Sequence, residues 1–240
     1  MSGWLHSTRA RIMLVLILCV GLLVTWPLRA AFSIFGLADM GVAARSLRGP
    51  IWWGGAEELQ IRGVQLGTVD VFLNPVQLLV GRVRIDMTRH SGAPDDISGA
   101  FTVGWGQRGI DDVTGSVALA APLAPLPVSR VEFDDMTIHF AGGRCVLAEG
   151  RVRARVPAFI NGLSLANGLS GDATCAGDAV ELPLVSQSGL ERLTVRIGAD
   201  GRYEATMRVK TADPLLGAAL GANGFRAMGD EQVLRTVGRL

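Results

Sequence analysis

The sequence predicts a mainly β protein, in which a single N-terminal transmembrane helix precedes a curled antiparallel β-sheet domain. The first observation is the alternation of apolar and polar residues after residue 80. In RVRIDMTR at 82–89, Val83, Ile85 and Met87 share one face and polar residues share the other, as in a half-buried strand. The second is the glycine content, 31 of 240 residues, which is nearly twice the usual share and indicates many turns.

Residues 12–28, IMLVLILCVGLLVTWPL, carry no charge and follow Arg9 and Arg11. A run of about 17 apolar residues is at the short end of what crosses a bilayer of about 30 Å. The two arginines and the positive-inside rule predict a cytoplasmic segment at 1–11 and a periplasmic location for everything after the span. The alternative is a cleaved signal peptide, but Arg29 directly after the apolar run makes a poor cleavage site. We therefore expect a retained signal-anchor.

Beyond the span, we expect a partly helical connector at 29–48 and one β domain at 49–240. Strands are predicted by alternation, and helices by capping and turn residues. The strands are expected within 82–89, 97–105, 111–119, 136–140, 150–156 and 193–209, and the helices at 33–45, 76–81 and 214–220. The turn GADG at 198–201 indicates a hairpin. The proline-rich stretch 121–130 could divide the sheet or form a wide turn, and we expect one continuous domain.

A sheet of this size must hide its apolar face. No β-α-β alternation is visible, so the strands are expected to pair in an antiparallel manner. An antiparallel sheet of eight or more strands must curl, close or stack to hide that face. We therefore expect a groove or an open barrel.

The cysteines fit an exported domain. Cys19 falls inside the span, which leaves Cys145 and Cys175 in the part expected in an oxidising compartment. A disulfide between them would close a loop of about 30 residues, for which chain entropy predicts roughly 3 to 4 kcal/mol. The alternative is that they are two unrelated small core residues.

Composition and motifs argue against several functions. A net charge of +1 with 19% charged residues provides no basic patch for nucleic acid. GWGQRG at 104–109 matches the dinucleotide fingerprint, but strand-like IDDVTGSVAL follows it where that fingerprint needs a helix. The segment is interpreted as a hairpin turn. No cofactor, metal ion or catalytic residue is predicted.

Acidic and histidine residues offer little for catalysis. Neighbouring residues on a strand point to opposite faces, so adjacent acids cannot easily act on one substrate, and Asp favours turns. We expect solvated turns at four acid pairs: Glu57–Glu58, Asp95–Asp96, Asp111–Asp112 and Asp134–Asp135. Neither His90 nor His139 has a partner at a metal-ligand spacing, and no G-x-S-x-G motif is present.

The stretch GPIWWGGAEELQIRG at 49–63 contains two adjacent tryptophans. On a strand they would point to opposite faces. We expect Trp52 to enter the apolar interior, and Trp53 to stay partly exposed and available to the membrane surface or to a partner.

Three motifs resemble those of the type II secretion system protein N family (general secretion pathway protein N, GspN). The family's G-T-V-W-S-G-x-A pattern is similar to the stretch with Gly49, Trp52, Gly54 and Ala56, although Pro50 and Trp53 depart from it. A second family pattern, W-x-L-x-P-x-x-L-L-x-G, is similar to VFLNPVQLLVG, with matches at Leu73, Pro75, Leu78, Leu79 and Gly81. Val71 stands there in place of the tryptophan. LLGAALGANGF and a closing VGRL are also similar.

The resemblance implies an accessory, non-catalytic inner-membrane component of the machine that exports folded proteins across the outer membrane. Its partners would be other inner-membrane and periplasmic components of that machine. The family is also similar to AsmA-type β-groove proteins. The alternative function is therefore a periplasmic lipid-binding or lipid-transfer protein whose apolar face lines an open groove. A third alternative is a periplasmic hydrolase with dispersed catalytic residues.

Overall fold

The computed structural model describes residues 8–34, 42–61, 64–91, 96–119, 126, 128–156, 165 and 167–239. The helices are α1 (Thr8–Val24), α2 (Leu28–Ile34), α3 (Pro75–Leu79) and α4 (Pro214–Ala222). The strands are β1 (Val42–Ala43), β2 (Ser46–Arg48), β3 (Trp53–Ile61), β4 (Val64–Leu73), β5 (Arg82–Arg89), β6 (Ile97–Gly104), β7 (Gln107–Ala118), β8 (Arg130–Ala141), β9 (Arg144–Arg155), β10 (Leu169–Asp172), β11 (Thr174–Ala176), β12 (Ala179–Ser186), β13 (Glu191–Gly198), β14 (Arg202–Lys210), β15 (Arg226–Met228) and β16 (Glu231–Arg239).

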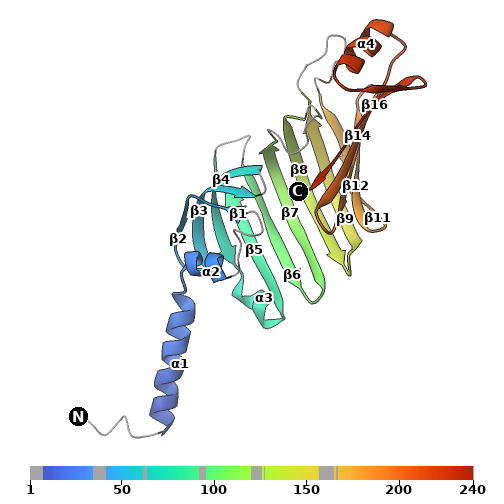
Figure 1. Cartoon of the computed structure of the whole chain (residues 1–240). Coiled ribbons are helices and arrows are strands. Elements are labelled where there is room, and N and C mark those ends of the chain that lie inside the picture. Colours follow the sequence, from blue (N-terminus) through green and yellow to red (C-terminus); the bar gives the residue numbers. More distant parts are fainter. Residues whose placement is uncertain are drawn as a thin grey trace.

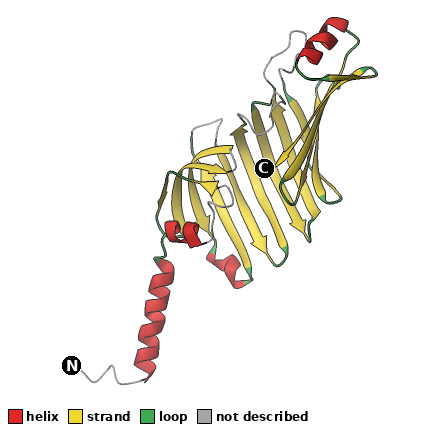
Figure 2. Cartoon of the chain, viewed as in Figure 1, coloured by secondary structure: helices red, strands yellow, loops and turns green. Residues whose placement is uncertain are grey.

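All these strands belong to one antiparallel sheet, which confirms the mainly β, antiparallel part of the predicted fold class. Its order is β1-β3-β4-β5-β6-β7-β8-β9-β10-β12-β13-β14-β16-β15, with β2 beside β3 and β11 beside β12. The sheet is not closed. Figure 1 shows β5 to β9 as a broad panel, and β12, β14 and β16 as a second panel that stands across its end. Figure 2 shows the helices at the ends of the sheet, so no described helix covers either face of it.

The main hydrophobic core lies on the inner face of the curled sheet. In the second panel, Leu184, Leu193, Met207 and Leu234 stand opposite one another across β12, β13, β14 and β16, and all are buried. The outer face of the same strands carries an ionic row in which Arg196 lies between Glu181 and Glu204. The period of two thus separates an apolar inner face from a charged outer face.

The disulfide links the two panels at their bend. Cys145 at the start of β9 is bonded to Cys175 in β11, with the Cα atoms 5.4 Å apart. The Cys145 backbone N–H also donates to the Gly177 carbonyl at 3.2 Å. Formation of this bond in the cell stays a prediction.

The N-terminal segment differs from the expected uninterrupted helix over 12–28. Helix α1 ends at Val24, and Pro27 then forms an isolated bridge with Pro50 before α2 begins. Proline cannot donate a backbone hydrogen bond, so it separates two helices here. Within the described part of the chain, no helix combines the length and the apolar character that crossing a membrane requires. The anchor at 12–28 stays a prediction.

The other predicted helices divide into two that are confirmed and one that is wrong. The helices expected at 76–81 and 214–220 correspond to α3 and α4. The helix expected at 33–45 is wrong at its end, because residues 42–43 form strand β1. Residues 35–41 lie outside the described residues.

The remaining segment predictions concern the hairpins and the domain boundary. Hairpin turns join β6 to β7 at 105–106 and β13 to β14 at 199–201, as predicted. Much of 121–130 lies outside the described residues. However, β7 pairs with β8 across it, so the sheet is continuous there.

The structure corrects the prediction that the acid pairs lie in turns. Three of them lie inside β3, β7 and β8, at bulges where the pairing register shifts. Their second members, Glu58, Asp112 and Asp135, have φ between 50° and 54°. Asp tolerates this left-handed conformation better than most residues, and a bulge can need it as much as a turn does. Asp95 lies outside the described residues.

Candidate functional site

An apolar groove of about 240 Å³ lies on the inner face of the sheet, between the two panels. Strands β7, β8, β9, β12, β13 and β14 supply most of its walls, and among the described lining residues only Tyr203 has a polar atom in its side chain. Phe133 and Val131 project from the first panel, and Leu193 and Val195 from the second. Such a lining can hold an apolar chain, but it offers almost no hydrogen bond to a polar ligand.

A polar contact between the two panels lies at one end of the groove. The Arg108 guanidinium, from the start of β7, donates to the Ala199 carbonyl in the β13–β14 turn at 2.6 Å. These residues are 91 positions apart, so the contact depends on the curl of the whole sheet.

The first motif stretch joins the N-terminal helices to the sheet. The Leu28 N–H donates to the Gly49 carbonyl at 3.0 Å, and the Ile51 N–H to the Trp26 carbonyl at 2.8 Å. A Cβ on Gly54 would lie 2.8 Å from the Leu28 side chain and 2.7 Å from the Arg48 carbonyl. Glycine at 54 is therefore required by the close approach of α2 to β3.

The two tryptophans have different surroundings. The expected reason was that they alternate on one strand, but only Trp53 belongs to the strand. Trp52 lies in the turn before β3, where it is half-buried and its carbonyl accepts from the Leu73 N–H at 3.2 Å. Trp53 begins β3, stands opposite Phe72 on the outer face and is 60% exposed. The available surface of Trp53 agrees with the expectation, and its role as a contact stays a prediction.

The second motif builds α3. Leu73 is buried, the Asn74 side chain accepts from the Val76 N–H at 3.0 Å, and Pro75 begins the helix. Gly81 has φ of 72°, and a Cβ there would collide with the Trp105 ring. The motif therefore specifies a capped helix and, at Gly81, a glycine over which the Trp105 ring packs.

A polar cluster occupies the outer face of β5, β6, β7 and β8. His139 Nε2 lies 2.6 Å from Asp111 Oδ1, and the Thr102 hydroxyl donates to the other Asp111 oxygen. Arg84 lies 2.9 Å from Asp86, 3.2 Å from Asp112 and 3.8 Å from Asp111. Alternation along the chain did not reveal this cluster, because Asp111 was predicted to lie in a turn. The signal that could have revealed it is the strand pairing, which brings residues 84, 102, 109 and 139 into one row.

Partial burial by itself raises the pKa of Asp111. Hydrogen bonds from Thr102 and His139, with the nearby charges of His139 and Arg84, outweigh this and hold the pKa below its usual value. Because Thr102 donates to the carboxylate rather than to the imidazole, the hydroxyl–imidazole–carboxylate order that activates a nucleophile is not formed. No group of three or more metal-ligating side chains occurs among the residues that the structure describes.

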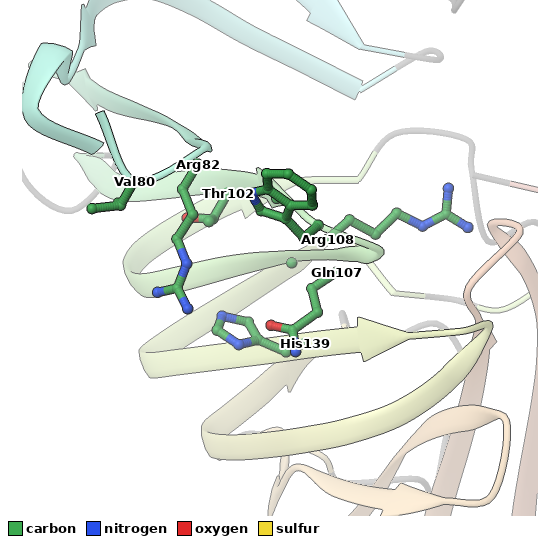
Figure 3. A pocket seen from close by; sticks show the side chains of 9 residues that line it. Val80, Arg82, Thr102, Gln107, Arg108 and His139 are labelled. Atoms are coloured by element: carbon green, nitrogen blue, oxygen red, sulfur yellow. The ribbon is translucent and has the colours of Figure 1, made fainter. Parts of the chain in front are cut away.

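An outer pocket of about 210 Å³ lies beside this cluster. Its lining combines Val80 and Trp105 with the polar side chains of Arg82, Gln107 and His139. Figure 3 shows Arg82 and His139 pointing toward one another across the pocket, while Arg108 points away from it.

Together, the open curled sheet and its apolar groove define a β-groove protein that also has an outward-facing polar pocket. The chain belongs to the type II secretion system protein N family, whose sequence model matches residues 40–234. It is 26% identical over 203 residues to the type II secretion system protein N of Vibrio cholerae serotype O1 (strain ATCC 39315 / El Tor Inaba N16961). That alignment covers 79% of this chain and 80% of the relative. No solved structure matches the chain. The predicted resemblance is confirmed.

Proposed function

We propose that this chain is a non-catalytic accessory subunit of the type II secretion system. Residues 12–28 would hold it in the bacterial inner membrane with residues 1–11 in the cytoplasm, and 49–240 would form its periplasmic domain. Membership of the protein N family is the observation that carries the proposal. In this role the chain engages other inner-membrane and periplasmic components during export of folded proteins across the outer membrane.

The exposed apolar side chains of α1 support a membrane anchor. Ile12 to Leu18 form consecutive apolar positions, and each of these side chains is more than half exposed. Apolar side chains exposed in a continuous run need a cover from outside the described chain. The uncharged run at 12–28 has seventeen residues, which is at the lower limit of the apolar lengths that span a bilayer.

The last long strand offers a place for a protein partner. Strand β16 pairs with β14 along its full length, but β15 covers only residues 231–233 on its other side. Among the described strands, β15 alone lies on that side of β16, and its pairing ends at Val233, so the edge beyond that residue can accept a further strand.

Site-specific photo-crosslinking in the cell tests this role. A photoreactive amino acid at Val237, which is exposed on β16, should crosslink to another secretion-system component that mass spectrometry identifies. The same amino acid at Val103, exposed on β6, serves as the control, because Val103 is paired with Val83 of β5 on one side and with Arg108 of β7 on the other. Crosslinks at neither position, or only to proteins outside the system, would contradict the proposed partner surface.

Lipid binding is the second candidate function, and the nearly unbroken apolar lining of the groove favours it. An acyl chain has no hydrogen-bonding groups, so it loses nothing when it leaves water for such a lining, whereas a peptide backbone would. The proposal is that the groove holds acyl chains of a periplasmic lipid.

Lipid extraction from purified protein tests this alternative with two matched variants. Ala154→Phe places a ring in the groove, whereas Ala148→Phe places the same ring on the same strand outside it. Lipid binding predicts phospholipid in the wild type and the Ala148 variant, and its loss in the Ala154 variant. Equal lipid in all three, or none in any, contradicts it.

A further inference from the structure

Helix α3 buries none of its own residues. It has five residues and carries Val76 and Leu79 exposed, with Leu79 at 87%, and Val80 follows it, also exposed. A helix this short is marginal in water and normally gains its stability from packing an apolar face. Here the Asn74 cap and the Gly81 N–H, which donates to the Leu78 carbonyl, hold the helix, and its apolar side chains are exposed.

Trp105 extends this exposed apolar surface. It lies in the β6–β7 turn, packs over Gly81 directly after α3 and is 87% exposed. We name Val76, Leu79, Val80 and Trp105 the α3 rim. Four large apolar side chains grouped at one place on a surface indicate a site of contact.

Arg82 stands beside the rim and has no ion-pair or hydrogen-bond partner among the described residues. A Cβ on Gly104, the residue before Trp105, would lie 3.1 Å from Arg82 Cγ, so the stem of Arg82 runs along the turn. Arginine and tryptophan next to aliphatic side chains are typical of the bilayer interface. There the apolar parts enter the lipid and the charged group reaches the phosphates.

The α3 rim lies at the end of the sheet from which α1 extends (Figure 1), and this location indicates what covers it. Figures 1 and 2 show α3 at the same end of the sheet as α1 and α2, whereas α4 lies at the opposite end. The apolar side chains of α1 are exposed as well, and one apolar surface at this end can cover both elements.

We propose that the α3 rim lies in the interface of the inner membrane, with Arg82 at the lipid phosphates. The β domain then contacts the bilayer at a second place and is not attached to the membrane through α1 alone. The inference rests on the proposed membrane anchor.

The test uses the full chain with Cys19 replaced by Ala, so that one new cysteine carries the label. An environment-sensitive fluorophore is attached to Leu79→Cys on the α3 rim. Leu215→Cys is the matched control: its leucine is 81% exposed on α4, a short helix that is also capped by an acidic or amide side chain and begins with proline. The protein is reconstituted into phosphatidylcholine vesicles with and without phosphatidylglycerol, and nitroxide-labelled lipid is the quencher.

If the α3 rim lies in the bilayer interface, the label at position 79 should have a blue-shifted emission. The nitroxide-labelled lipid should quench most of that emission. At position 215 we expect the emission of a label in water and no quenching. Phosphatidylglycerol should strengthen quenching at position 79, and Arg82→Gln should remove that gain.

Three results would overturn the inference. Equal, water-like emission at both positions would place the rim in solvent. A blue shift at position 79 without quenching by lipid would mean that protein, such as a second copy, covers the rim. Failure of the full chain to float with vesicles would remove the proposed anchor as well, whereas the first two results leave the anchor intact.

Discussion

The turn that ends at Trp52 gives two adjacent tryptophans different roles. Trp52 is half-buried where the N-terminal helices meet the sheet, and Trp53 is exposed on the outer face. We expect Trp52→Ala to lower the free energy of unfolding by about 2 kcal/mol or more, because it leaves a cavity. Trp53→Ala should change it by less than about 1 kcal/mol.

Chemical denaturation of the two variants measures this difference. If the Trp53 variant loses more stability than the Trp52 variant, the assignment of the two side chains is reversed.

Asp111 makes the stability of the sheet depend on pH. Its pKa is lower in the folded protein than its ordinary value of 3.8, so the unfolded chain binds its proton first as the pH falls. The stabilisation is therefore complete above about pH 5 and is lost as the pH falls through the folded pKa. Asp111→Asn should cost about 1 to 3 kcal/mol at pH 7, because it removes a charged acceptor.

Denaturation midpoints of the wild type and the Asn variant at pH 7 and pH 3 test this prediction. The difference in denaturation midpoint between the two proteins should be smaller at pH 3 than at pH 7. An equal difference at both pH values would show that the charge of Asp111 contributes nothing to stability.

At the level of elements, the disulfide holds β9 to β11 where the sheet bends. Replacing both Cys145 and Cys175 with serine should lower the free energy of unfolding by roughly 3 kcal/mol, since the unfolded chain then gains loop entropy. The loop closed by the bond has a sequence separation of 30 residues. Thiol labelling of unfolded, non-reduced protein should modify Cys19 alone, and labelling of all three cysteines would exclude the bond.

Strands were predictable where one face of the segment meets water. The hairpins at 105–106 and 199–201 and the apolar faces of β5 and β13 follow directly from alternation and turn residues. Helix α4 was predictable from Pro214 after a capping aspartate. These features depend only on residues close in sequence.

Features that depend on distant partners were not predictable. The acid pairs were predicted to lie in turns, but whether a left-handed residue serves a turn or a bulge is decided by the neighbouring strand. His139 gained its contact with Asp111 through pairing of β7 with β8, across 28 positions. The curl that creates the groove brings together residues as distant in sequence as Arg108 and Ala199.

At the scale of the whole molecule, the anchor and the sheet act together. Because α2 packs closely on Gly54, we expect residues 12–34 to stay attached to the β domain. N-terminal sequencing of membrane-extracted protein should then begin at or near Met1. A mature start near Ile34 would show a cleaved signal peptide.

The central claim is that this chain serves protein secretion, and a deletion strain of its own bacterium tests that most directly. Without the chain, enzymes that use the type II secretion system should accumulate in the periplasm, and expression of the full chain should restore their export. Normal secretion in the deletion strain, with altered lipid composition of the outer membrane, would contradict the account and favour lipid transport through the groove.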